Sequence, residues 1–125
     1  MKFLAATQLK VAAVTHTQVS DVDVKERIED QLKAHDVLLY MKGTPDFPQC
    51  GFSGQTVAAL NAVGKPYSYV NIFEDPEGRE GLKEYSNWPT FPQLYFKGEL
   101  IGGCDIVVEM YHSGELQKLL EDSAA

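Results

Sequence analysis

The chain has 125 residues, of which 44% are apolar, and it carries 11 Lys and Arg residues against 18 Asp and Glu residues. This length predicts one domain, and the apolar fraction is sufficient for a hydrophobic core without a metal ion or a set of disulfides. The net charge of −7 disfavours nucleic acid and anionic membrane surfaces as main partners. Two cysteines are too few for a disulfide-rich secreted scaffold, and their separation does not fit a zinc site.

The first 20 residues differ in composition from the rest. They contain Lys2 and Lys10 and no acidic residue, so the remaining chain has a net charge of −9. The apolar run after Met1 is shorter than a signal peptide requires, the segment lacks the arginines of a transit peptide, and no stretch is long enough for a membrane helix. We expect a disordered extension over residues 1–20, one domain over residues 21–125 and a cytoplasmic location. An organellar matrix is the alternative if residues 1–20 prove to be a transit peptide.

Helical and extended patterns alternate along the rest of the chain. In order, they predict a helix over about residues 21–34, a buried strand over 37–41, a loop over 42–49, a helix over 52–63, a strand over 67–72, a helix over 76–85, a hairpin with strands 91–96 and 100–102, and helices over 105–111 and 115–122. We expect Ser20 to cap the first helix, Gly64 to stop the second, and Asp75 with Pro76 to start the third. This order predicts an α/β fold with one four-stranded mixed sheet and helices on both faces.

Cys50 is the most informative residue for chemistry. It follows a proline-containing loop and begins a helix directly after the first predicted strand. Backbone N–H groups and the positive end of the helix dipole stabilise a thiolate at such a position. The ordinary alternative is a buried, inert cysteine, which is less expected between Pro48 and Gly51.

Four motifs closely resemble those of the monothiol glutaredoxins, which belong to the thioredoxin superfamily. They are Lys42 with its proline loop, Cys50-Gly51-Phe52-Ser53, Asn87-Trp88-Pro89-Thr90-Phe91-Pro92-Gln93 and Gly102-Gly103-Cys104-Asp105. The resemblance covers about residues 24–120. It implies a thioredoxin-like fold and a site for glutathione.

Ser53 stands where the dithiol relatives have a second cysteine. A serine cannot resolve a mixed disulfide, but a single thiolate can still be glutathionylated or bind a soft metal. Iron–sulfur clusters normally need four thiolates, so a [2Fe–2S] cluster would have to be shared between two chains. The resemblance implies that Cys50 from each of two subunits and the sulfur atoms of two glutathione molecules hold the cluster. It also implies a dimer with the cluster and a monomer without it.

The resemblance assigns four side chains around Cys50 to glutathione. Lys42 and Arg79 match the positions that bind the glycine carboxylate, a role that arginine can fill with two parallel hydrogen bonds. For each of them the alternative is a solvated surface charge. Gln49 and Phe52, which flank Cys50, are further candidates for the same pocket.

Thr90, Phe91 and Pro92 form the second wall of the implied site. Only about 5–6% of X–Pro bonds are cis, yet the resemblance implies a cis bond before Pro92 and an outward-facing Phe91 backbone. The N–H and C=O of Phe91 would pair with the glutathione cysteine in the manner of a strand. Trp88 and Pro89 would shape this wall, although a lone Trp is more often a core residue.

The resemblance places the γ-glutamyl end of glutathione at the start of the next helix. Gly103 and Cys104 would offer backbone N–H groups to its carboxylate, and Asp105 would accept from its ammonium. Asp105 is alternatively an ordinary helix cap. Ile106 replaces a second aspartate that many relatives carry. We expect Cys104 to be inert, with an occasional disulfide to Cys50 under oxidation as the alternative.

Three functions remain open at this point. The first is an iron–sulfur carrier that holds a labile [2Fe–2S] cluster and acts in cluster assembly, transfer and iron homeostasis. The second is a glutathione-dependent thiol–disulfide oxidoreductase, or deglutathionylating enzyme, that works through Cys50. The third is a binding module for a partner such as the BolA-type proteins.

Overall fold

The computed structural model describes residues 21–122, and these form five α-helices, one short 3-10 helix and four strands. In chain order they are α1 (Asp21–Ala34), β1 (Val37–Met41), α2 (Gly51–Val63), β2 (Ser68–Asn71), η3 (Ile72–Glu74), α3 (Pro76–Ser86), β3 (Gln93–Phe96), β4 (Glu99–Gly102), α4 (Cys104–Ser113) and α5 (Glu115–Glu121). The described part of the chain has no helix that is both long and apolar enough to cross a membrane.

The four strands form one mixed sheet in the order β2-β1-β3-β4. β1 pairs with β2 in parallel and with β3 in antiparallel orientation, and β4 pairs with β3 in antiparallel orientation. The parallel pair is connected through α2, as a parallel connection requires. All five residues of β1 are buried because helices cover both faces of this central strand.

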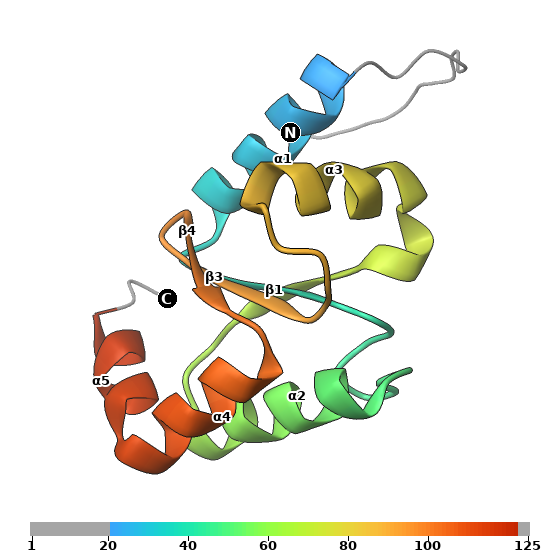
Figure 1. Ribbon diagram of the computed structural model, residues 1–125. Coiled ribbons are helices and arrows are strands. Elements are labelled where there is room, and N and C mark those ends of the chain that lie inside the picture. Colours follow the sequence, from blue (N-terminus) through green and yellow to red (C-terminus); the bar gives the residue numbers. More distant parts are fainter. Residues whose placement is uncertain (1–20, 123–125) are drawn as a thin grey trace.

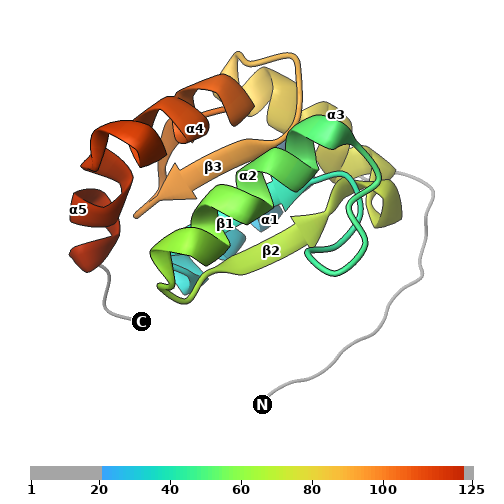
Figure 2. The ribbon, with the colours of Figure 1, turned by 90° about the horizontal axis from the view of Figure 1, so that it is seen from below.

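The sheet separates two helical layers and two halves of the hydrophobic core (Figure 1). Leu38 and Tyr40 of β1 pack toward α1 and α3, whereas Leu39 and Met41 pack toward α2, α4 and α5. Seen from below, α2 and α4 lie beside each other across one face of the sheet (Figure 2). Alternate residues of one short strand therefore hold both layers in place.

The expected α/β architecture is confirmed, and the boundaries differ by a few residues. The strand expected to reach residue 72 ends at Asn71, because the Asn71 side chain accepts a hydrogen bond from the Phe73 N–H and starts the 3-10 turn. The strand expected from residue 91 begins at Gln93, after Pro92, which has no N–H for a strand ladder. Asp75 caps α3 by accepting from the Gly78 N–H, as predicted.

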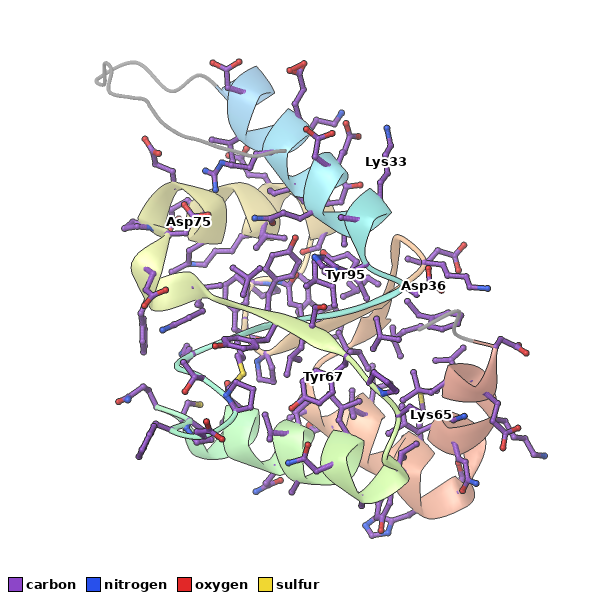
Figure 3. All side chains as sticks on the ribbon, turned by 180° about the vertical axis from the view of Figure 1, so that it is seen from behind. Lys33, Asp36, Lys65, Tyr67, Asp75 and Tyr95 are labelled. Atoms are coloured by element: carbon purple, nitrogen blue, oxygen red, sulfur yellow. The ribbon has the colours of Figure 1, made fainter. Side chains whose placement is uncertain are left out.

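The predicted extension over residues 1–20 and the Ser20 cap lie outside the described residues. The division of the chain at residue 20 therefore stays a prediction. Within the described part, Arg27 of α1 forms an ion pair with Asp75, the residue that caps α3. Asp75 lies at the α1 side of the sheet (Figure 3), so this pair joins the two helices of that layer.

Candidate functional site

Cys50 is the residue at which α2 begins. It occupies the N-cap position with an extended backbone, and its side chain is half-buried. The thiol makes no capping hydrogen bond. The first-turn N–H groups of a helix have no partner within the helix, so they remain available to a thiolate.

The surroundings of Cys50 lower the pKa of its thiol. The backbone N–H of Ser53 has the largest effect, and it lowers the pKa. Partial burial acts in the opposite direction, and the N–H of Phe52 and the charge of Lys42 lower the pKa further. The net shift is downward, which confirms the direction expected from the sequence and makes Cys50 a better nucleophile and metal ligand near neutral pH.

Alkylation tests this shift. We expect the rate of Cys50 alkylation by iodoacetamide to reach half of its alkaline maximum at a lower pH than for an ordinary cysteine, because a thiol with a lowered pKa ionises at lower pH. Lys42→Gln should move this midpoint upward, since it removes a positive charge that favours the thiolate. Lys97→Gln, in the turn between β3 and β4, is the matched control and should leave it unchanged. A wild-type midpoint at the ordinary cysteine value would contradict the assignment.

Ser53 also has a structural role, besides standing where dithiol relatives have a second cysteine. Its side chain is completely buried, and its Oγ accepts a hydrogen bond of 3.1 Å from the Lys42 N–H. This bond joins the first turn of α2 to the residue that follows β1. Ser53 therefore holds the backbones on either side of the loop in one arrangement, with Lys42 and Cys50 at its ends.

The loop between Lys42 and Cys50 is closed by hydrogen bonds at both ends. The Gln49 N–H donates to the Lys42 carbonyl oxygen at 2.9 Å, and the Gly43 N–H donates to Asn71 Oδ1 at 3.0 Å. Asn71 also accepts from Phe73, so it connects the loop to η3. The loop thus presents Cys50 from a defined backbone rather than from a free segment.

A pocket of about 420 Å³ lies next to the start of α2. Its lining contains most of the residues that the sequence assigned to glutathione: Lys42, Phe52, Thr90, Phe91, Pro92, Gly103, Cys104 and Asp105, together with Trp88 and Ile106. Lys42 supplies a positive charge, and Asp105 supplies an exposed carboxylate at the first turn of α4. A ligand with both carboxylates and an ammonium group finds complementary charges here.

The second wall of the pocket has the expected backbone. The Phe91–Pro92 peptide is cis, as the resemblance implied. A Cβ atom on Gly103 would lie 3.2 Å from the Pro92 carbonyl oxygen and 3.3 Å from Trp88 Nε1. Glycine therefore allows the start of α4 to pack closely against the segment that carries Trp88 and Pro92.

Three residues of the expected site, Cys50, Gln49 and Arg79, do not line this pocket. Gln49 is exposed, and its side chain donates a long hydrogen bond of 3.5 Å to the Phe47 carbonyl oxygen. The Arg79 guanidinium lies over the Phe73 ring at 5.7 Å, and its buried Nε has no hydrogen-bond partner within the described residues. The role of Arg79 toward glutathione stays a prediction.

Cys104 differs from Cys50 in its environment. Its side chain is 7% exposed, and its Sγ contacts Gln55 Oε1 at 3.4 Å. Both cysteines are free thiols. Cys104 lines the pocket but is shielded, which agrees with an inert residue, whereas Cys50 is the accessible thiol.

The described residues offer few side chains that could bind a metal ion. Between residues 21 and 122, no group of three or more His, Cys, Asp or Glu side chains is placed to hold a metal ion. A larger cleft of about 690 Å³ lies between α1 and α3, but its lining contains no cysteine or histidine. One accessible thiol beside a charged pocket is therefore the chemistry that the described residues offer.

The sequence reasoning missed the residues that support the site from behind. From the sequence alone, Gln93 belongs to a motif, Asn71 lies within an expected strand, and Ser53 marks only the position of an absent thiol. Each is a polar residue at the end of a strand or the start of a helix. That signal is too common to identify a supporting role without the fold.

Comparison with known proteins agrees with this geometry. The family model described as Glutaredoxin matches residues 37–101. The chain is 55% identical over 100 residues to Glutaredoxin 4 of Escherichia coli K12, covering 80% of this chain and 87% of the relative. It is 54% identical over 96 residues to probable monothiol glutaredoxin 2 of Rickettsia felis, covering 77% and 92%.

A solved structure of similar sequence has the same architecture. The reduced apo form of poplar GrxS14 superimposes with a TM-score of 0.68 at 55% identity, covering 78% of this chain and 90% of that chain. The four-stranded mixed sheet with helices on both faces is thus the thioredoxin-like fold. Cys50 is followed three residues later by Ser53 in place of a second cysteine. With the family match and the relatives, this shows that the chain belongs to the glutaredoxin family and is a monothiol member of it.

Proposed function

We propose that this monothiol glutaredoxin binds glutathione in the pocket beside Cys50 and, as a dimer, holds a labile [2Fe–2S] cluster that it passes to acceptor proteins. In this proposal it acts in cluster assembly and transfer and in iron homeostasis, in the cytoplasm. The observation that carries the proposal is Cys50 itself. It is an accessible thiol with a lowered pKa next to a pocket with complementary charges.

The pocket supports glutathione as the ligand. Lys42 and the start of α4 both line the pocket. In this proposal Lys42 binds one carboxylate, and the backbone N–H groups of Gly103 and Cys104 bind the other. Asp105 lies beside them as a partner for the ammonium group. Phe91 would pair its backbone with the cysteine of the tripeptide.

The small number of thiolate ligands in each chain supports a cluster that is shared between two chains. A [2Fe–2S] cluster needs four thiolates, and each chain has one accessible cysteine thiol beside a pocket for a ligand that brings another. Two chains and two glutathione molecules complete the set. The cluster is the cargo, and the two glutathione thiolates are held without covalent bonds to the protein, which favours release to an acceptor.

Thiol–disulfide exchange as the main activity is less well supported. Ser53 occupies the position of the resolving thiol in dithiol relatives, and it is completely buried and hydrogen-bonded to the Lys42 N–H. A BolA-type protein and iron–sulfur acceptors are the partners in this proposal. We expect the protein without a cluster to be a monomer.

Anaerobic reconstitution tests the function. The full chain is incubated with ferric iron and sulfide, with and without glutathione, and then analysed by visible absorption and gel filtration. We expect a coloured dimer with glutathione and a colourless monomer without it. A colourless monomer in both samples would contradict the proposal, and a disulfide-reduction turnover that equals that of dithiol glutaredoxins would favour the enzymatic alternative.

A further inference from the structure

Gln93 is a buried polar residue that does not line the pocket. It is the first residue of β3, and its exposed fraction is 0%. Its Nε2 donates hydrogen bonds to two carbonyl oxygens, those of Trp88 at 3.0 Å and Thr90 at 3.2 Å. Its Oε1 accepts from the Tyr95 hydroxyl at 3.0 Å. Both ends of this amide are therefore satisfied inside the protein.

The partners of the Gln93 amide fix its orientation. Carbonyl oxygens can only accept, so the NH₂ group must face Trp88 and Thr90. Tyr95 lies between the sheet and the layer of α1 and α3 (Figure 3), with its ring edge-on to Tyr40 at a centroid distance of 5.6 Å. Burial raises the pKa of Tyr95 to about 12, so its hydroxyl keeps the proton that it donates to Gln93.

The bond to Thr90 determines the direction of the neighbouring N–H. The Thr90 C=O and the Phe91 N–H belong to one trans peptide unit and point in opposite directions. Because Gln93 holds the Thr90 oxygen, the Phe91 N–H must point away from Gln93. Thr90 and Phe91 both line the pocket, whereas Gln93 does not. A hydrogen bond to the carbonyl also polarises the peptide and makes its N–H a stronger donor.

We propose that Gln93 is a positioning residue for glutathione, which it serves by holding the Trp88 and Thr90 carbonyl groups and so directing the Phe91 N–H into the pocket. This inference rests on the proposed function, in which the Phe91 backbone pairs with the glutathione cysteine. It adds a residue that touches no ligand, lies behind the pocket wall and determines how well the wall binds.

Two substitutions at Gln93 separate positioning from simple packing. Gln93→Met keeps a similar volume but removes the two hydrogen bonds that the Gln93 side chain donates to Trp88 and Thr90. We expect about tenfold weaker glutathione binding, the usual effect of losing one good hydrogen bond. Gln93→Glu keeps the acceptor for Tyr95 but faces two carbonyl oxygens with a carboxylate. Burial favours the protonated form of such a glutamate, which can donate again, so its affinity relative to wild type should recover at mildly acid pH.

The control is Tyr40→Phe. It removes a partly buried hydrogen bond of 2.7 Å to Gln31 in the same layer and makes no change in the 88–90 segment. Reduced glutathione is titrated into each full-length variant and followed by amide chemical shifts, at a temperature where circular dichroism shows every variant folded. Tyr40→Phe should lower thermal stability and leave the affinity unchanged. Tyr95→Phe, which frees the Gln93 amide to turn, should weaken binding by a smaller factor than Gln93→Met.

The outcomes distinguish this inference from the function on which it rests. Weaker binding by Gln93→Met, with recovery of Gln93→Glu at acid pH, supports positioning. If wild type binds glutathione and the folded Gln93 variants bind it equally well, the inference is wrong and the proposed function stands. If wild type itself does not bind glutathione, the proposed site and this inference are both wrong. If Gln93→Met does not fold, Gln93→Glu and Tyr95→Phe decide in the same way.

Discussion

Cys50→Ser is expected to abolish the visible absorption of the reconstituted protein and the dimer that accompanies it. Serine has no thiolate, so each chain would lose the one accessible ligand that it offers to a shared cluster. The fold should not suffer, because Cys50 is only half-buried and makes no capping hydrogen bond. Serine is one of the best N-cap residues, and we expect the free energy of unfolding to stay equal or rise by up to about 1 kcal/mol.

Cys104→Ser is the matched control for this experiment. Cys104 lines the pocket beside Cys50, but its side chain is buried and contacts Gln55. We expect this variant to keep the colour and the dimer. Visible absorption, gel filtration and urea unfolding are measured on both variants. A Cys50→Ser protein that keeps its colour, or a Cys104→Ser protein that is folded and loses it, would show that the ligand is assigned to the wrong cysteine.

Gly43→Ala is expected to damage the loop before Cys50 and to weaken glutathione binding. Gly43 has a φ of +92°, and a Cβ there would lie 2.5 Å from the Phe47 carbonyl oxygen and 2.7 Å from the Gln49 nitrogen. Both contacts are with backbone, so the loop itself would have to move. The left-handed conformation and the overpacking together should cost roughly 2–4 kcal/mol of unfolding free energy.

Gly98→Ala is the control that measures the effect of the left-handed backbone conformation on the unfolding free energy without the overpacking. Gly98 has a φ of +86°, but nothing lies within 4 Å of the position that a Cβ would take. We expect it to cost only about 1 kcal/mol and to leave glutathione binding unchanged. Urea unfolding and glutathione titration are compared for the two variants. Equal losses of stability, or unchanged glutathione affinity in a folded Gly43→Ala protein, would mean that the loop does not position the site.

Much of the fold could be predicted because its signals are local. The apolar run over 37–41 predicted a buried strand, and every residue of β1 is buried. Gly64 and Asp75 end and begin helices as expected, since a left-handed C-cap and an acidic N-cap are properties of single residues. The end of β2 could not be placed, because Asn71 uses its side chain to start a 3-10 turn.

The candidate site could be predicted in part. The helix start at Cys50 and the motif that contains Phe91 both locate the pocket, and most of the assigned residues line it. The Gln93 side chain donates to carbonyl oxygens only three and five residues before it, but a glutamine at the start of a strand does not by itself indicate such bonds. Arg79 contacts the Phe73 ring, and its expected role toward the glycine carboxylate stays a prediction.

Native mass spectrometry of the reconstituted protein tests the central claim most directly. The coloured species is isolated without oxygen, and its mass gives the numbers of chains, clusters and glutathione molecules in one particle. A site with a single accessible thiol per chain predicts two chains, one [2Fe–2S] cluster and two glutathione molecules, since four thiolates are then present. A coloured particle that contains a single chain, or two chains and no glutathione, would contradict it.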